Sequence, residues 1–238
     1  MGALMVLMFS ANTFAAAGKI LLTRGDVTVN GQAAVLQGQV EKGDIIKAGS
    51  DGSATVVMSD NSVLNIVANS EIAIEDFVYS AAAPGSNKAD INIVKGTLRY
   101  VSGGIAKADP DKVSLRAGTA TIGIRGTAIE ASFDGISVSV NTGLGLATIT
   151  MPGRPPMTVA VGNAGTANTQ TGDTSVAPAP APAFVAAAQS AVEATLATDA
   201  GESAATDLIG GLITGDAAQA DSGGDDLAVL VVATMSAN

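Results

Sequence analysis

Short runs of valine, isoleucine, leucine and threonine alternate with turn residues through most of the chain. Between residues 25 and 161, glycine, asparagine, aspartate or serine interrupts these runs roughly every eight to twelve residues, a spacing typical of all-β domains. Within the runs apolar residues recur at every second position, as in the pairs Val27/Val29, Ile72/Ile74, Ile91/Ile93 and Val138/Val140. A period of two buries one face of a strand. No convincing helical period occurs before Pro178, so we predict an all-β fold.

Pairs of turn-forming residues predict where the strands reverse. Asn30-Gly31 is a strong hairpin signal because both residue types tolerate positive φ. Similar pairs are Gly43-Asp44, Asp51-Gly52, Asp60-Asn61 and Asp134-Gly135, and residues 81–88 around Pro84-Gly85 are predicted to form a loop. None of these pairs has the spacing and distal glutamate of a calcium-binding loop, so we interpret them as turns.

The stretch Thr119-Ala-Thr-Ile-Gly-Ile-Arg-Gly-Thr127 departs from ordinary strand chemistry. It places Arg125 between Gly123 and Gly126 in an otherwise apolar, β-branched run. Glycine inside a strand marks a bulge or a close approach of backbones, and an arginine in an apolar run needs a carboxylate or carbonyls. We therefore predict that Gly123, Arg125, Gly126 and Thr127 form a buried structural joint or a recognition point.

Arg99 is the second arginine of interest, because it also lies in an apolar, strand-like run. In the structural interpretation, Arg99 and Arg125 each form a salt bridge with a neighbouring acid or cap carbonyls at a turn. In the functional interpretation they hold the carboxylate or backbone of a partner. Acids that we consider plausible mates are Glu71, Glu75, Asp76 and Glu130.

Five further motifs precede this stretch in a fixed order. They are Gly25-Asp-Val-Thr-Val-Asn-Gly31, Gly43-Asp-Ile-Ile-Lys-Ala-Gly-Ser-Asp-Gly-Ser-Ala54, Ser59-Asp-Asn-Ser-Val-Leu-Asn-Ile66, Asn69-Ser-Glu-Ile-Ala-Ile-Glu-Asp-Phe77 and Lys95-Gly-Thr-Leu-Arg-Tyr-Val-Ser-Gly103. Ending in Ile122-Gly-Ile-Arg-Gly-Thr127, the series resembles the FecR domain family. The resemblance implies a twisted β-solenoid, in which short strands stack coil upon coil.

The resemblance also implies a function. FecR regulators of iron uptake use this type of domain outside the inner membrane to receive a signal from an outer-membrane receptor and relay it to a sigma factor. We find no anti-sigma segment or membrane helix in this sequence, so only the exported binding module carries over. We expect a non-enzymatic protein-interaction or signal-sensing module of the bacterial envelope, with another envelope protein or a glycan as its partner. The alternative is a structural or adhesive envelope protein that binds glycans or self-assembles through its β edges.

The two ends of the chain differ from the β body. The apolar run Ala3-Leu-Met-Val-Leu-Met-Phe9, followed by Ala15-Ala-Ala17, predicts a signal peptide over residues 1–17, although no basic residue precedes the run. The run is too short to span a membrane. We expect cleavage after Ala17 and a periplasmic or extracellular protein.

We divide the remaining chain by composition. Residues 18–135 form the FecR-like β domain and residues 136–176 extend it with additional strands, although residues 162–176 are expected to loosen. Residues 177–183 form an extended Pro/Ala linker, and residues 184–238 an acidic, alanine-rich, low-complexity tail that is weakly structured or disordered. In the tail, residues 184–196 and 205–213 are candidate helices without enough apolar face to fold alone, and residues 227–233 form an apolar end.

Composition closes most catalytic schemes. The chain has no cysteine or histidine, so it lacks thiolate nucleophiles, Cys/His zinc sites and a Ser-His-Asp triad. Glu75 and Asp76 are adjacent in a strand and so point to opposite faces, and Asp109 and Asp111 are expected in a turn, so neither pair faces across a cleft. Aromatic residues, which usually line a glycan-binding cleft, make up only 3% of the chain. We therefore expect no enzyme, no cofactor and no metal.

The negative charge is concentrated in the tail. Of the net charge of −10, the body contributes −2, from twelve bases and fourteen acids, and the tail −8, from eight acids and no base. A near-neutral body argues against nucleic acid as a partner.

Overall fold

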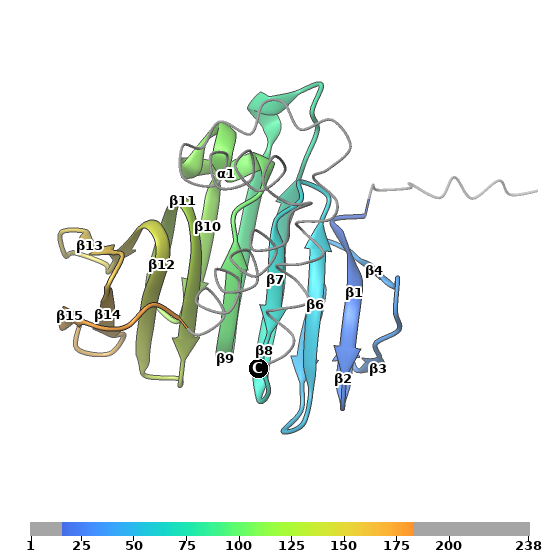
Figure 1. Cartoon of the computed structure of the whole chain (residues 1–238), viewed down its shortest axis with the longest axis horizontal. Coiled ribbons are helices and arrows are strands. Elements are labelled where there is room, and N and C mark those ends of the chain that lie inside the picture. The colour runs from blue at the N-terminus through green and yellow to red at the C-terminus, as the bar shows by residue number, and fades with distance from the viewer. Residues whose placement is uncertain (1–15, 183–238) are drawn as a thin grey trace, which may run out of the picture.

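The computed structural model describes residues 16–182, which form a single hydrogen-bonded β structure (Figure 1). Most of the predicted signal peptide, and the tail with its candidate helices and apolar end, lie outside the described residues. The described strands are β1 (Gly18–Arg24), β2 (Val27–Val29), β3 (Gln32–Ala33), β4 (Gln39–Val40), β5 (Ile45–Ala48), β6 (Ser53–Met58), β7 (Val63–Ile66), β8 (Ser70–Val78), β9 (Lys88–Val101), β10 (Val113–Ala117), β11 (Ala120–Phe133), β12 (Ser137–Thr150), β13 (Met157–Ala160), β14 (Asn163–Asn168) and β15 (Thr174–Pro178). The short helices are η1 (Pro84–Ser86), α1 (Gly104–Ala108) and η2 (Pro110–Lys112).

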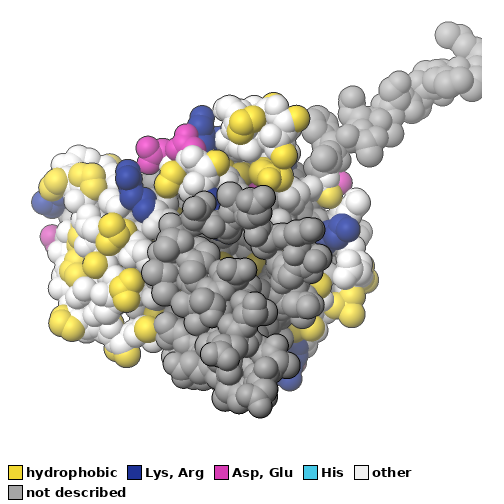
Figure 2. Space-filling view, turned by 45° about the horizontal axis from the view of Figure 1, so that its top comes forward, with side chains coloured by type: hydrophobic (Ala, Val, Ile, Leu, Met, Phe, Trp, Pro, Cys, Tyr) yellow, Lys and Arg dark blue, Asp and Glu magenta, His cyan; other side chains and the backbone are white. Residues whose placement is uncertain are grey.

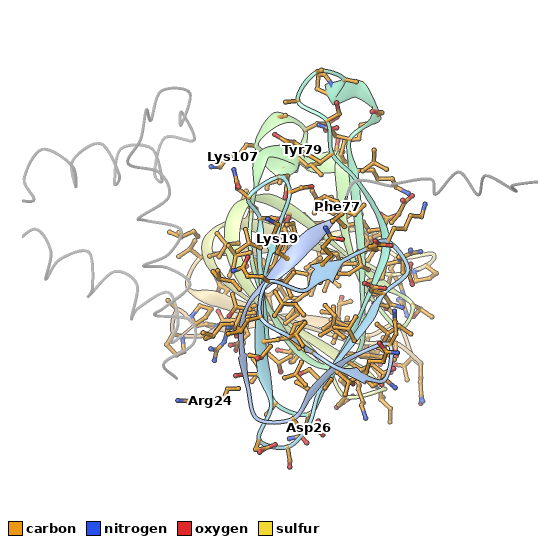
Figure 3. The ribbon with its side chains drawn as sticks, turned by 90° about the vertical axis from the view of Figure 1, so that its right-hand side faces the viewer. Lys19, Arg24, Asp26, Phe77, Tyr79 and Lys107 are labelled. Atoms are coloured by element: carbon orange, nitrogen blue, oxygen red, sulfur yellow. The ribbon has the colours of Figure 1, made fainter. Side chains whose placement is uncertain are left out.

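The strands form two layers around one core. The front layer has the order β4-β1-β6-β7-β9-β11-β12-β14-β15. The back layer has the order β3-β2-β5-β8-β9-β10-β11-β12-β13. Seen end-on, the ribbon surrounds the packed side chains in the manner of a flattened barrel (Figure 3).

Three long strands belong to both layers, because each bends where it passes from one to the other. β9 bends at Gly96, β11 at Gly126 and β12 at Gly145, and φ is positive at all three glycines. On one side of each bend the strand pairs within the back layer, and on the other side within the front layer. These bends join the layers into one sheet.

The all-β prediction is confirmed, but the predicted solenoid is not. Stacked coils of a β-solenoid pair in parallel at a fixed repeat. Here all strand pairs are antiparallel except β9–β10. Tight hairpins are the physical reason, since they return the chain beside the strand it has just left; at the first of them Asn30 and Gly31 both have positive φ, as predicted.

The core has the composition that the alternating pattern predicts. Ile72, Ile74, Ile91 and Ile93 are fully buried, and Val, Ile, Leu and Ala supply most of the cluster around them. Tyr100 is the largest fully buried side chain, and burial raises the pKa of its hydroxyl. Because one continuous cluster spans both layers, the two layers share one core.

Helix α1 was not predicted, because it is only five residues long. It closes one end of the core through Ile105 and Ala106, which are both buried. The buried carboxylate of Asp60 accepts hydrogen bonds from Ser62 and from the backbone N–H of Ile105, the latter at 3.1 Å. The hairpin between β6 and β7 therefore holds the start of α1.

The β structure extends further toward the C-terminus than predicted. Residues 162–176, expected to loosen, instead supply β14 and most of β15, and Asn163 pairs with Pro178 inside the predicted linker. The next residues also contact the sheet, since Asn141 Nδ2 donates a 2.9 Å hydrogen bond to the carbonyl of Pro180. A proline is tolerated here because β15 is an edge strand, where the missing N–H leaves no neighbouring carbonyl unpaired.

Candidate functional site

Arg125 lies on the surface, so the predicted buried joint is wrong for this residue. Its side chain is 64% exposed, and within residues 16–182 its ion pair is a 3.5 Å contact between Nη2 and the Oδ1 of Asp111, a side chain that is itself 82% exposed. Asp111 was not among the acids that we considered as mates. An exposed pair at this distance contributes about 0–1 kcal/mol to stability, so the fold leaves the guanidinium available.

The glycines beside Arg125 have different roles. Gly126 lies in the bulge where β11 changes layer, with φ of 62° and no heavy atom near the position of a Cβ. Gly123 lies in the regular part of β11, where a Cβ would make only ordinary contacts with Thr148 at 3.9 Å. Thr127 lies in the same bulge as Gly126. The motif Ile-Arg-Gly-Thr therefore marks the bend of a strand, as glycine in a strand suggests, but at the surface.

An exposed apolar side chain lies opposite Arg125 at this bend. Arg125 pairs in register with Leu146, and Leu146 pairs with Ala160, which precedes Val161. Leu146 and Val161 are exposed by 41% and 50%. We name Asp111, Arg125, Gly126 and Leu146 the corner patch. Asp111 belongs to η2, and both η2 and α1 contact β11, the strand of Arg125.

Arg99 has the structural role that one interpretation predicted. Its side chain is only 12% exposed, and its Nε donates a 2.9 Å hydrogen bond to Oε2 of Glu130, the residue directly opposite on β11. Glu130 was among the acids considered as mates. Arg99 also pairs in register with Asn65, whose amide donates to Thr55 on the next strand. A polar row therefore crosses the outer face of the front layer, and Arg99 is part of it.

The other acids considered as mates of the two arginines are held by different bases. Glu71 pairs with Lys47 at 3.2 Å and Glu75 with Arg116, while Asp76 pairs with Lys42 at 2.7 Å. The hydrogen bond from Lys42 holds the pKa of Asp76 below its usual value, against the opposing effect of burial. Asp76 also lies opposite Asp90 on β9, and Lys88 pairs with both carboxylates, at 3.6 Å and 2.5 Å.

The pair Asp109/Asp111 forms a turn, as predicted. The side chain of Asp109 accepts a hydrogen bond from the backbone N–H of Asp111 and so caps η2. Within residues 16–182, no group of three or more acidic side chains is placed to hold a metal ion.

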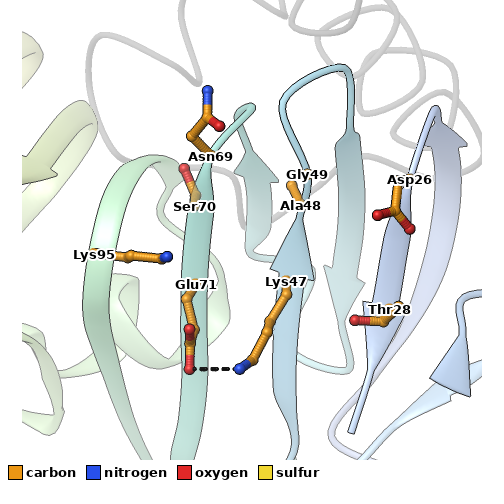
Figure 4. Close-up of a pocket in the computed structure, with 9 residues that line it drawn as sticks. All are labelled: Asp26, Thr28, Lys47, Ala48, Gly49, Asn69, Ser70, Glu71 and Lys95. Atoms are coloured by element: carbon orange, nitrogen blue, oxygen red, sulfur yellow. Dashed lines mark ion pairs between the residues drawn. The ribbon is translucent and has the colours of Figure 1, made fainter. Parts of the chain in front are cut away.

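A shallow hollow lies on the outer face of the back layer (Figure 4). It has a volume of about 330 Å³ and is lined mainly by polar groups of β2, β5, β8 and β9. Thr28, Lys47, Glu71 and Lys95 follow one another in register across these strands. Because Glu71 already pairs with Lys47, we interpret the hollow as a salt-bridged surface of the sheet.

The exposed charges elsewhere are scattered. Figure 2 shows apolar and charged side chains interspersed over the described part of the face that it presents. No helix among the described residues has the length and hydropathy needed to cross a membrane.

Comparison with known proteins gives one family and a distant structural similarity. No curated protein matches the sequence. Two crystal structures of a "putative anti-sigma factor" from Parabacteroides distasonis, at 1.65 and 2.50 Å resolution, each align with a TM-score of 0.47 and 12% identity. The alignments cover 60% of this chain and 63% of the first structure, and 64% of this chain and 72% of the second. Residues 44–144 match the family model described as FecR protein, which confirms the FecR domain recognised from the sequence motifs.

Proposed function

We propose that this protein is a non-enzymatic interaction module of the bacterial envelope, and that it binds another protein through the corner patch. The proposal assumes export by the predicted leader to the periplasm or beyond. The observation that carries it is the exposed guanidinium of Arg125 at the bend of β11, within the segment that matches the FecR family. The sigma-factor role of FecR regulators is not part of the proposal.

The chemistry of the patch suits recognition of a protein backbone or carboxylate. A guanidinium offers five N–H donors in a planar fork, and it binds carboxylates in a bidentate manner. The missing side chain at Gly126 leaves room for a partner backbone to approach, because no heavy atom lies within 4 Å of the Cβ position. Leu146, directly opposite Arg125 on β12, adds apolar area beside these polar groups. Such a mixture of arginine and apolar residues is typical of binding hot spots.

The patch is also held rigidly, which lowers the entropic cost of binding. Before the bend, β11 is paired with β10 on one side and β12 on the other. After the bend, it is paired with β9 and β12. A partner therefore meets a preformed surface.

The test compares binding and stability in the same variants of the full chain. We expect the tagged protein, cross-linked in the cell envelope, to capture a defined protein, and Arg125→Ala to lose that capture with a melting temperature within about 2 °C of the unchanged protein. The control is Arg154→Ala, because Arg154 is an exposed arginine in the loop between β12 and β13, away from the patch. Capture that survives Arg125→Ala, or that is lost equally in Arg154→Ala, would overturn the proposal.

A second candidate function is self-assembly through a β edge. β15 is exposed along its whole length and pairs on one side with β14, so its other edge can add a strand. Pro178 at its end limits how far such pairing could extend. Sedimentation velocity distinguishes the two functions, since self-assembly predicts species that grow with protein concentration and interaction with another protein does not.

A further inference from the structure

An apolar row crosses the outer face of the front layer, on the side opposite the main core. It consists of five side chains in register on neighbouring strands, Val57, Val63, Val101, Ala128 and Leu144. Leu21 packs against its end, and Lys19 stands opposite Val57. An outward-facing apolar row of this length is unusual for a strand pattern with one buried face, and it indicates that something packs on it.

The row is about as long as a short helix. Five strands separated by roughly 4.8 Å span about 19 Å. The neighbouring row on the same face is polar, with Thr55, Asn65, Arg99, Glu130 and Asn141 in register. The face therefore has one apolar row beside one polar row. An amphipathic segment matches this pattern better than a uniformly apolar partner surface does.

The described chain ends at the edge of this same face. Asn141, the last member of the polar row, holds the carbonyl of Pro180 at 2.9 Å. The described chain therefore ends two residues after Pro180, which is held beside Asn141. The residues that follow are tethered to this face, and the tether gives them an effective concentration that a separate partner lacks.

We infer that residues 184–196 of this chain pack as a helix along the apolar row. Their sequence places Phe184, Ala188, Val192 and Leu196 at intervals of four, with Ser190 on the opposite side. Thirteen helical residues span about 20 Å, which matches the length of the row. Packing on the row supplies the apolar contacts that this segment lacks when alone.

Charge supports this occupant and its direction. The chain from residue 184 onward has eight acids and no base. Running from Leu144 toward Val57, the helix would end near Lys19, and a cation is favoured at a helix C-terminus.

The absence of cysteine from the sequence allows a clean cross-linking test in the full chain. We expect Val101→Cys combined with Ala188→Cys to form an intramolecular disulfide under mild oxidation, since a disulfide requires Cα atoms roughly 4.4–6.8 Å apart. Two controls are Val101→Cys with Ser190→Cys, on the opposite helical face, and Thr148→Cys with Ala188→Cys, on the back layer. Both should react on the order of tenfold more slowly.

Three results would overturn the inference. These are equal rates in all pairs, no disulfide in any pair, and a disulfide that joins two chains, which would make a second copy the occupant. Hydrogen exchange gives an independent measurement in the full chain. Leu144→Lys should speed exchange in residues 184–196 by roughly tenfold while β9 and β11 remain protected. Unchanged exchange in that segment would also refute the inference.

Discussion

Replacing Gly96 by alanine should destabilise the fold strongly, because Gly96 is where β9 passes between the layers. A Cβ at this position would lie 2.5 Å from the Cα of Ser70 and 2.7 Å from the carbonyl oxygen of Asn69, and φ is +86°. The two contacts are with backbone, so a side-chain rotation cannot relieve them. Ser70 Oγ also accepts a 2.8 Å hydrogen bond from the N–H of Thr97, and that bond breaks if the strand moves.

The magnitude follows from three contributions. Left-handed backbone costs an alanine about 1–2 kcal/mol, overpacking costs about 1–3 kcal/mol, and the lost hydrogen bond about 1 kcal/mol. Restricting the unfolded chain returns about 0.4–1 kcal/mol. We expect a net loss of about 2–6 kcal/mol, and at the midpoint of about 4 kcal/mol a drop in melting temperature of roughly 8–16 °C for a domain of this size.

Gly126→Ala is the matched control, because Gly126 also has positive φ at a strand bend but has no atom within 4 Å of the Cβ position. It should lose about 1 kcal/mol, from backbone strain alone. Thermal and urea unfolding followed by circular dichroism measure both variants. Equal losses in the two variants would refute the reasoning, because close packing at Gly96 would then contribute nothing.

Three further predictions follow from the ion pairs and the N-terminus. Arg99→Ala should lower the free energy of unfolding in urea by about 2 kcal/mol, because it removes a charged hydrogen bond to Glu130 from a largely buried position. Lys47→Ala, which breaks a more exposed ion pair with Glu71, should lower it by under about 1 kcal/mol. A larger loss for Lys47→Ala than for Arg99→Ala would contradict the structural role of Arg99. Lys42 lowers the pKa of Asp76, and the backbone N–H groups of Ser137 and Ile136 lower the pKa of Asp134. The pKa of each carboxyl is lower in the folded than in the unfolded protein, so its stabilisation is complete above the unfolded pKa and is lost as pH falls through the folded pKa. The melting temperature should therefore drop below about pH 4. A melting temperature that is constant from pH 6 to pH 3 argues against this. N-terminal sequencing of the protein from the envelope should begin at Gly18, and an intact Met1 in the cytosol would disprove export. Cleavage before Gly18 removes the carbonyl of buried Ala17, which accepts a 2.8 Å hydrogen bond from the backbone N–H of Ser59.

Periodicity predicted the strands well because it reports burial directly. The alternation at Ile72/Ile74 and Ile91/Ile93 identified side chains that the structure buries completely. Turn chemistry was equally reliable, since Asn30-Gly31 has the positive φ angles that the residue types favour. Both signals depend only on residues that are close in sequence, so neither requires knowledge of which strands pair.

The features that sequence did not predict depend on distant partners. We expected a solenoid because the sequence resembles the FecR family. Only the strand pairing in the structure shows that nearly all neighbouring strands are antiparallel. β15 contains threonine, serine and proline, so its composition indicates a linker until β14 is seen beside it. A chain ending at Val176 would lose the last pairs of β15, so the boundary of the β structure lies after Pro180.

The two arginines show the same limit. Both occupy apolar runs, and the sequence alone gave no reason to separate them. Arg99 lies in the middle of the front layer, where strands on both sides bury its stem, whereas Arg125 lies at a bend that turns it outward. The pairing of β9 with β11 places Glu130 directly opposite Arg99. A correct prediction of this pairing and its register would therefore have identified Glu130 as the partner of Arg99.

The most direct test of the central claim is photo-cross-linking from the corner patch in living cells. A photoreactive amino acid replaces Leu146, beside Arg125, and a control protein carries it at Arg154. We expect a cross-link from position 146 to one defined envelope protein that disappears when Arg125→Ala is added, with no such cross-link from position 154. Equal cross-links from both positions, or a cross-link from position 146 that persists in Arg125→Ala, would contradict it.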